Sequence, residues 1–299
     1  MHVQRMRHLL ERPEYVCRPS QVARRLLLAA RRPRGRVQAR LAWGDPIVVD
    51  ADQMIGHTIL RRGAFDLPVA EALWRLTDPG DHALDIGAHI GVMTSLLARR
   101  SGARGRVDAF EPQPATYDLL RENVRLWDSG AAIHLHQVAA SDESGVAALY
   151  IPDESQRNDS LSTLIPRSGF RPVTTERKRL DDVLFDVSPT VAKLDVEGAE
   201  LAVLNGARRV LASIRDLVFE HREYPTAVTT HLESQGFTIL RLEIASVWRL
   251  ALVDPGSVRR RRQEGDNMLA TRAVARAGER FTQGGWHCLH GKISRRGCA

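Results

Sequence analysis

The feature that most constrains the fold is a regular alternation of short apolar runs with amphipathic helical runs, which begins near residue 82. The first pair is HALDIG followed by GVMTSLLARR, and the second is GRVDAFEP followed by PATYDLLRENVRLW. This alternation is typical of a mostly parallel sheet flanked by helices on both faces. We therefore predict an α/β fold for the main part of the chain.

Later segments extend the same sheet. Apolar runs predict further strands in AIHLHQVAA, PTVAKLDVEG, DLVFEH, FTILRLE, VWRLALV and NMLATRA, and a short strand or hairpin arm in VAALYIP. The run GAELAVLNGARRVLAS predicts a helix, because its apolar residues recur at spacings of three and four. Together these segments predict a Rossmann-like sheet of about seven strands, most of them parallel.

Two segments lie outside this pattern. Residues 152–172 are polar and carry three prolines and a glycine, which predicts a long loop of the kind that often binds ligands. The N-terminal part predicts an arm, in which IVVDA and HTILRR are candidate strands. We divide the chain into a basic extension and arm (1–60), a main domain (61–254) and a basic segment with a candidate last strand (255–299).

The net charge of +7 belongs to the two ends of the chain. Residues 1–40 carry +9 and residues 255–299 carry +7, which leaves −9 for residues 41–254. Arginine-rich ends can bind nucleic acid or anionic lipid, but solvated tails are the simpler interpretation. The stretch SQVARRLLLAARR predicts a short basic amphipathic helix, which we expect to pack against the main domain rather than contact a membrane.

The sequence shows no targeting signal, and its cysteine usage favours the cytoplasm. No apolar run approaches the roughly 20 residues needed to span a bilayer, and no signal peptide is evident. Cys17, Cys288 and Cys298 are far apart and form no CxxC pair, which fits a reducing compartment.

The loop DIGAHIG leaves the first strand and enters a helix, so its backbone N–H groups and the positive helix end face a bound ligand. Gly87 lets the chain turn, and Gly91 lets the helix start close to ligand and strand. His89 stands where many nucleotide loops have a third glycine. Asp85, at the strand end, argues against a pyrophosphate and favours a cationic ligand such as S-adenosylmethionine.

Two more acids follow at later strand ends. Glu111 in AFEP lies 20 residues after Gly91, where a ribose-binding carboxylate is expected. The pair of Asp85 and Glu111 is the strongest indication of this ligand. Asp142 in VAASDESG could face the adenine amino group, although a turn rich in Ser, Asp and Gly also forms for local reasons.

Candidate catalytic residues lie in KLDVEGAE and FEHREYP. Lys193, Asp195 and Glu197 alternate, so they share one face if the strand continues. Ligands of open α/β sheets bind at the carboxyl ends of the strands, so Asp195 should project toward the transferred group. Glu200 is expected to complement the following helix N-terminus. His221 is a second candidate base, with a structural role as the alternative.

The motifs DIGAHIG, FEP, SDESG, RLDD, KLDVEGAE and NGA, in this order, resemble the FkbM-type methyltransferases, a branch of the class I S-adenosylmethionine-dependent fold. The resemblance covers roughly residues 60–245. It implies a seven-stranded sheet whose last strand is antiparallel, and S-adenosylmethionine as the cofactor. We assign cofactor binding to Asp85, Gly87, His89, Gly91, Glu111 and Asp142. At the position of His89 the family more often has asparagine.

The resemblance implies an O-methyltransferase that acts on a hydroxyl of a sugar, glycolipid or polyketide-type natural product. The protein then mainly aligns the acceptor, and a base takes the hydroxyl proton. Asp195 is the first candidate for that base and His221 the second. We expect no metal site, although a metal-assisted reaction would use Asp195 with Glu220 or His221.

Other functions are less well supported. A nucleic-acid methyltransferase acting on base amino groups typically carries a polar-Pro-Pro-aromatic segment after the fourth strand, where this chain has DVEG. A protein acceptor stays open as an alternative. A nicotinamide-dependent oxidoreductase is disfavoured by Asp85 and by the absence of GxGxxG. A non-catalytic interaction module is a further alternative. We expect a small-molecule or glycan acceptor and no nucleic-acid partner.

Overall fold

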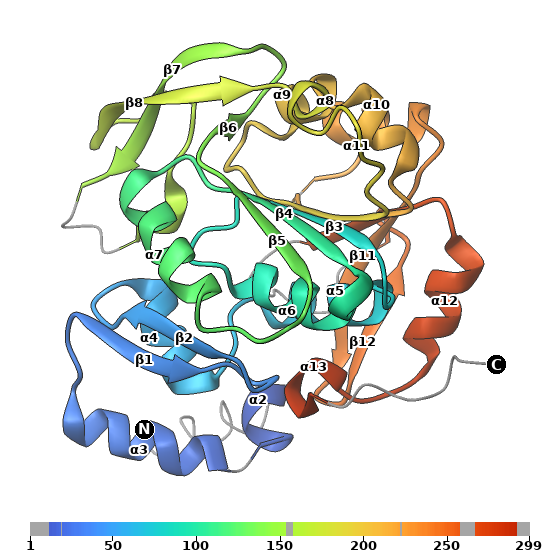
Figure 1. Cartoon of the computed structure of the whole chain (residues 1–299). Helices are drawn as coiled ribbons and strands as arrows, with labels where there is room; N and C mark the ends of the chain where they lie inside the picture. The colour runs from blue at the N-terminus through green and yellow to red at the C-terminus, as the bar shows by residue number, and fades with distance from the viewer. Residues whose placement is uncertain (1–11, 19, 154–157, 222, 258–266, 292–299) are drawn as a thin grey trace.

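The chain is described by a computed structural model, which covers residues 12–18, 20–153, 158–221, 223–257 and 267–291. Its centre is an eight-stranded sheet (Figure 1). In chain order, the strands are β3 (His82–Ile86), β4 (Arg106–Phe110), β5 (Ala132–His136), β9 (Val191–Leu194), β10 (Asp216–Glu220), β11 (Thr238–Ser246), β12 (Arg249–Val253) and β13 (Asn267–Thr271).

The order of strands across this sheet is β12-β11-β13-β10-β9-β3-β4-β5. The five strands from β10 to β5 pair in parallel, whereas β13 is antiparallel to both β10 and β11. The predicted Rossmann-like sheet with an antiparallel last strand is therefore confirmed. It has one strand more than the seven expected, because β12 folds back on β11 as an antiparallel edge strand.

Helices cover both faces of the sheet, as predicted (Figure 1). Successive residues of a strand point to opposite faces, so Val218 in β10 joins one core while Leu217 and Phe219 join the other. The first face is covered by α4 (Met54–Arg62), α5 (Leu67–Leu76), α6 (Val92–Ser101), α7 (Pro114–Val124), α12 (Val274–Thr282) and α13 (His287–His290). The second face is covered by α8 (Leu180–Val183), α9 (Glu200–Asn205), α10 (Arg208–Ser213) and α11 (Ala227–Ser234).

The N-terminal arm contributes α2 (Pro13–Val16), α3 (Ser20–Arg31) and a two-stranded sheet of β1 (Arg36–Arg40) and β2 (Pro46–Asp50). The strand predicted at IVVDA is confirmed. The strand predicted at HTILRR is wrong, because these residues lie in α4. There Ile55 and Ile59 are buried one turn apart, and Gly63, at φ 75°, ends the helix in the left-handed conformation.

A buried ion pair within α5 forms hydrogen bonds with the backbone of the C-terminal segment. Arg75 Nε donates to Glu71 Oε1 at 2.7 Å, and both side chains are almost fully buried. The other Glu71 oxygen accepts from the backbone N–H of Cys288 at 2.9 Å. The Arg75 guanidinium also donates to backbone carbonyls at the end of α12, including that of Gln283 at 2.9 Å. This segment and the sheet share one core.

A second, three-stranded sheet lies above the main one in Figure 1. It contains β6 (Ala139–Ala140), β7 (Gly145–Pro152) and β8 (Phe170–Lys178), in the order β6-β8-β7. The loop predicted at 152–172 therefore ends in strand β8, and its described middle part begins with the short 3-10 helix η3 (Asp159–Leu161).

The helix predicted after KLDVEGAE is two helices, α9 and α10, with a break at Gly206. A Cβ atom at Gly206 would lie 1.9 Å from the Ser141 carbonyl oxygen, so the chain approaches its neighbour too closely there for a larger residue. Among the described residues, no helix combines the length and apolar character that a membrane crossing requires.

Candidate active site

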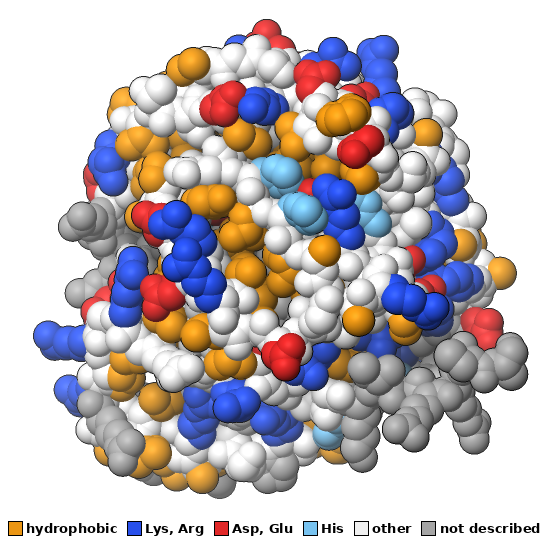
Figure 2. Space-filling view, in the orientation of Figure 1, with side chains coloured by type: hydrophobic (Ala, Val, Ile, Leu, Met, Phe, Trp, Pro, Cys, Tyr) orange, Lys and Arg blue, Asp and Glu red, His pale blue; other side chains and the backbone are white. Residues whose placement is uncertain are grey.

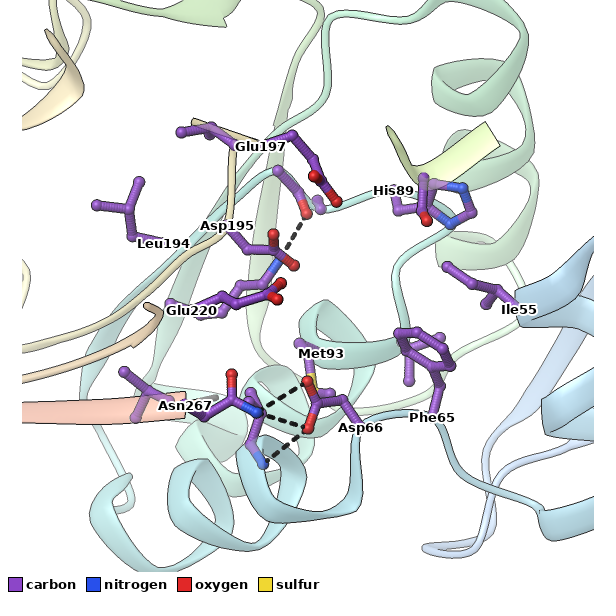
Figure 3. A pocket seen from close by; sticks show the side chains of 18 of the residues that line it. Ile55, Phe65, Asp66, His89, Met93, Leu194, Asp195, Glu197, Glu220 and Asn267 are labelled. Carbon is purple, nitrogen blue, oxygen red and sulfur yellow. Dashed lines mark hydrogen bonds and ion pairs between the residues drawn. The ribbon is translucent and has the colours of Figure 1, made fainter. Parts of the chain in front are cut away.

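A cavity of about 830 Å³ opens at the carboxyl ends of the parallel strands (Figure 3). The chain order of the strands reverses here, since β3 leads to β4 and β5 on one side whereas β9 and β10 lie on the other. Ligands of such sheets bind at this crevice. Residues of the loops after β3, β4 and β9 line the cavity, together with the end of β10, the segment 158–164 and parts of α2 and α4.

The loop after β3 forms one wall of this cavity. Gly87 and His89 both line it, and both have left-handed backbones, at φ 81° and 49°. A Cβ at Gly87 would lie 1.8 Å from the Asp195 carbonyl oxygen, so only glycine lets the loops after β3 and β9 meet this closely. Asparagine and histidine are among the non-glycine residues that tolerate positive φ best, so His89 suits this backbone as asparagine would.

Glu111 is held rigidly beside this loop. One of its oxygens accepts from the His89 backbone N–H at 2.9 Å, and the other accepts from the Gln113 backbone N–H at 2.8 Å. The side chain is 6% exposed, and this burial raises the pKa of the Glu111 carboxyl above its ordinary value. A carboxylate has about four acceptor positions, so Glu111 can take further hydrogen bonds from a ligand in the cavity.

Three carboxylates gather at the opposite side of the cavity. Asp195, Glu197 and Glu220 each place one oxygen within 4.8 Å of the others (Figure 3). Burial raises the pKa of Glu197 to about 7, and the charges of Asp195 and Glu220 add to this effect. Oxygen ligands in such a group also suit a hard divalent cation. The structure thus brings together Asp195 and Glu220, the two acids considered for a metal-assisted reaction.

Lys193 links this group to the loop after β3. Its Nζ donates to the Gly87 carbonyl oxygen at 2.6 Å and lies 3.3 Å from Asp195 Oδ2. Burial alone would lower the pKa of Lys193, but Asp195 and Asp85 raise it. The ammonium therefore stays charged beside Asp195. The sequence analysis placed Lys193 on the same face as Asp195 but assigned it no function.

Asp85 lies behind the cavity rather than in its wall. It is fully buried and accepts a hydrogen bond from Thr94 Oγ1 at 2.6 Å. Its other oxygen accepts no hydrogen bond among the described residues, but Lys193 Nζ lies 3.7 Å from it. Burial raises the pKa of Asp85, and the nearby ammonium opposes this shift. Asp85 thus contacts Lys193 and the first turn of α6 rather than the cavity.

Three other predicted site residues do not line the cavity. Gly91, at φ 92°, directly precedes α6, and a Cβ there would lie 2.6 Å from Leu120, so glycine lets α6 pack closely against α7. Asp142 is exposed and accepts from Ser141 Oγ at 3.1 Å. His221 Nε2 hydrogen-bonds Thr226 Oγ1 at 2.7 Å, which favours the structural role that was its alternative.

Several residues that line the cavity were not predicted from the sequence. Asp66 lies across from the carboxylate group, and its oxygens accept from Asn267 Nδ2 at 3.1 and 3.2 Å (Figure 3). Burial raises the pKa of Asp66 to about 7, with a further contribution from the charge of Asp195. Ile55 and Phe65 form an apolar wall near this pair. No motif marks Asp66 and Asn267, because they lie 201 residues apart and meet only in the folded chain.

Comparison with known proteins agrees with this architecture. A family model described as "Methyltransferase FkbM domain" matches residues 85–239. The chain is 32% identical to "Methyltransferase sdnD" of Sordaria araneosa over 193 residues, which cover 53% of this chain and 74% of the relative. It is 31% identical to "Methyltransferase 1" of Beauveria bassiana over 180 residues, or 52% of this chain and 72% of the relative.

A more distant relative carries a more specific name. The chain is 26% identical to "Hexuronic acid methyltransferase AglP" of Haloferax volcanii over 172 residues, which cover 52% of this chain and 69% of that protein. The matched family region contains the loop after β3, Glu111, the carboxylates that follow β9, and Glu220 at the end of β10. The chain therefore belongs to the FkbM methyltransferase family.

Proposed function

We propose that this protein is an S-adenosylmethionine-dependent O-methyltransferase that acts on a hydroxyl of a sugar, glycolipid or polyketide-type natural product. One observation carries the proposal. A single continuous cavity connects Glu111 and the loop after β3 with Asp195 after β9. A nucleoside-recognising carboxylate and a candidate base thus face the same space, as methyl transfer between two bound molecules requires.

The residues present fit the proposed methyl donor. The two oxygens of Glu111 each accept one described hydrogen bond, which leaves acceptor positions for the two ribose hydroxyls. Val138 and Ala139 line the same cavity and offer an apolar surface for the adenine ring. They follow His136, whose carbonyl oxygen accepts from the Glu111 backbone N–H at 3.0 Å. The backbone of Gly87 and His89 holds the remaining part of the donor. When bound, the donor supplies an activated methyl group on a positively charged sulfur.

Asp195 is the group that we assign to the acceptor hydroxyl. Its carboxylate accepts the hydroxyl proton, and Lys193 at 3.3 Å keeps the carboxylate oriented. Glu197, with its pKa raised to about 7, can hold that proton next to Asp195 at neutral pH. We do not assign the base role to His221, because its ring is hydrogen-bonded to the Thr226 hydroxyl.

The chemistry of the cavity favours a polyhydroxylated acceptor. Four carboxylates, Asp66, Asp195, Glu197 and Glu220, face the same space and can accept hydrogen bonds from neighbouring hydroxyls. The same charges repel phosphates, which counts against a nucleic-acid acceptor. The resemblance to a hexuronic acid methyltransferase supports a sugar acceptor.

The direct test is transfer of a radiolabelled methyl group from S-adenosylmethionine to small molecules and glycans extracted from the source cells. The proposal expects a labelled product whose methyl group resists mild base, as an ether does. Label confined to protein or nucleic acid, or a base-labile methyl ester, would contradict it. A parallel reaction with EDTA is expected to proceed at the same rate. Loss of activity that Mg²⁺ restores would instead make Asp195, Glu197 and Glu220 metal ligands.

A further inference from the structure

Helix α3 presents an apolar stripe to solvent. Ala23, Leu26, Leu27 and Ala30 are all exposed, and their spacings of three and four place them on one side of the helix. Leu26 is 69% exposed and Leu27 is 49% exposed. Two neighbouring leucines with this exposure form a contiguous apolar patch, unlike single apolar residues scattered over a surface. We call these four residues the α3 stripe.

The opposite side of α3 fixes its orientation on the protein. Gln21 is buried, and Leu28 packs against the main core. Arg25 donates to the Tyr15 hydroxyl at 3.3 Å, and its guanidinium lies 5.5 Å from the centre of that ring. The helix therefore packs against α2 and α4, whereas the sequence predicted packing against the main domain, whose core it reaches through Leu28. That packing is also what turns Leu26 and Leu27 outward.

Unpaired positive charge borders the α3 stripe. Within the described part of the chain, Arg24, Arg32 and Arg34 have no acidic side chain within ion-pair distance. The pKa of Arg24 is lowered by its partial burial and by the nearby charge of Arg18, so cations crowd this region. Figure 2 shows hydrophobic and basic side chains side by side over the lower part of the molecule, where Figure 1 draws α3 and β1.

We propose that the α3 stripe docks the protein on the surface of an anionic membrane. The helix lies in the plane of the interface, the two leucines enter the boundary between headgroups and acyl chains, and the arginines pair with lipid phosphates. An interfacial helix needs both features, an apolar face and a cationic border. Both features are present at α3, and none of the described helices is long and apolar enough to cross the bilayer.

Other occupants fit this surface less well. Two copies of the chain related by a two-fold axis would bring two positively charged surfaces together, each with Arg24, Arg32 and Arg34, which costs energy. Nucleic acid would neutralise the arginines but leave Leu26 and Leu27 without apolar partners. Lipid satisfies the charge and the leucines at once.

Docking at α3 would place the methyl-transfer cavity near the membrane. Helix α3 packs against α2 and α4. Those two helices contribute Pro13, Met54 and Thr58 to the cavity wall. In the docked enzyme, the cavity wall formed by α2 and α4 would therefore lie nearer the lipid than α8 does (Figure 1).

Vesicle sedimentation with the full chain tests the proposal. The protein should co-sediment with vesicles of equal parts phosphatidylglycerol and phosphatidylcholine, and not with phosphatidylcholine alone. The double variant Leu26→Ser/Leu27→Ser should bind at least about tenfold more weakly, because it loses most of the inserted apolar area. Phe185→Ser is the matched control, since Phe185 is 74% exposed after α8, at the opposite end of the molecule.

A second pair of variants tests the charge. Arg32→Gln/Arg34→Gln should weaken binding roughly tenfold, whereas Arg171→Gln, an exposed position in β8, should not change it. Vesicle binding that survives the leucine variant overturns the proposal. So does the absence of vesicle binding by the unaltered protein. A dimer in solution that Leu26→Ser/Leu27→Ser dissociates would assign the stripe to a second copy instead. Circular dichroism of the variants confirms that they are folded.

Discussion

At the scale of single residues, the proposed function assigns donor recognition and proton transfer to two different carboxylates. Glu111 is held by two backbone N–H groups, so it faces the cavity in a fixed position. Asp195 is held by Lys193, whose ammonium also touches the loop after β3. The two carboxylates therefore share a cavity but have different partners. Substitution of each should change a different measured quantity.

For the proposed base, we expect Asp195→Asn to lower kcat about a hundredfold or more, because a positioned base contributes at least that much to many enzymes. The amide keeps the size of the side chain and can still contact Lys193, so donor affinity should change less than about twofold. Single-turnover methyl transfer and a donor titration measure the two effects. Undiminished turnover in Asp195→Asn would remove Asp195 from the base role.

Asp66 should make the stability of the fold depend on pH. Its pKa is raised from 3.8 to about 7, so the folded state holds a proton that the unfolded chain releases. The free energy of unfolding must therefore fall as the pH rises from about 4 to about 7. We expect Asp66→Asn to flatten this decline by about 1 to 2 kcal/mol, after allowance for partial exposure.

Urea unfolding at pH 5 and pH 8 measures this effect. The amide oxygen of asparagine can still accept from Asn267, so the comparison isolates the charge at position 66. Equal pH dependence in the protein and in Asp66→Asn would show that Asp66 ionises normally. Glu197, whose pKa is also raised to about 7, acts in the same direction and leaves a residual slope.

The sequence predicts where the strands end but not the direction of the side chains that follow them. It located strand ends correctly, and Glu111 and Asp195 there do line the cavity. It could not tell which way a side chain turns after its strand ends. His221 turns to Thr226, and Asp85 turns back into the core toward Lys193. Their roles in catalysis and donor binding stay predictions.

At the scale of elements, the site depends on the close meeting of the loops after β3 and β9. Gly87 permits it, since its Cα lies against the carbonyl of Asp195. The Asp195 backbone N–H also donates to the Ile86 carbonyl at 3.0 Å, which continues the parallel pairing beyond the strands. A change in either loop must therefore be transmitted to the other.

We expect Gly87→Ala to lower the free energy of unfolding by about 3 kcal/mol, because it combines an unfavourable positive φ with a backbone overlap. Gly35→Ala is the matched control. Gly35 has a similar φ of 62° but nothing within 4 Å of an added Cβ, so its cost should be only about 1 kcal/mol. Chemical denaturation of both variants gives the comparison. Equal losses would mean that the loops do not meet as described.

The elements themselves were largely predictable where the pattern was local. The βα alternation after residue 82 correctly gave the parallel strands, and the late strand segments correctly gave β11, β12 and β13. The segment 57–62 was assigned to the wrong class, since short apolar runs of this kind suit a strand and a buried helix equally. Strand β8 was missed, because its polar residues mark only a small sheet outside the main core.

At the scale of the whole molecule, the arm and the C-terminal segment are parts of one packed body with the sheet. Their apolar residues share a core with the central strands. The cavity shows the same dependence, since Asp66 follows the arm and Asn267 begins the last strand. Such a pair, 201 residues apart, leaves no local pattern in the sequence. This is why the acceptor side of the site could not be predicted.

We expect Glu71→Ala to lower the free energy of unfolding by about 3 to 5 kcal/mol, because it leaves the Arg75 charge buried without its partner. Asp118→Ala is a suitable control, since its ion pair with Arg121 is exposed and should contribute less than about 1 kcal/mol. Thermal and urea unfolding report both values. Similar effects of the two substitutions would show that the hydrogen bonds between Glu71 and the C-terminal segment do not stabilise the fold.

The central claim is that Glu111 holds S-adenosylmethionine in this cavity, and calorimetric titration of the donor tests it most directly. The protein should bind, Asp142→Ala should bind equally well, and Glu111→Ala should bind about a hundredfold more weakly. That loss corresponds to two charge-assisted hydrogen bonds of about 1.5 kcal/mol each. Absence of heat with the unaltered protein, or unchanged affinity in Glu111→Ala, would contradict the account.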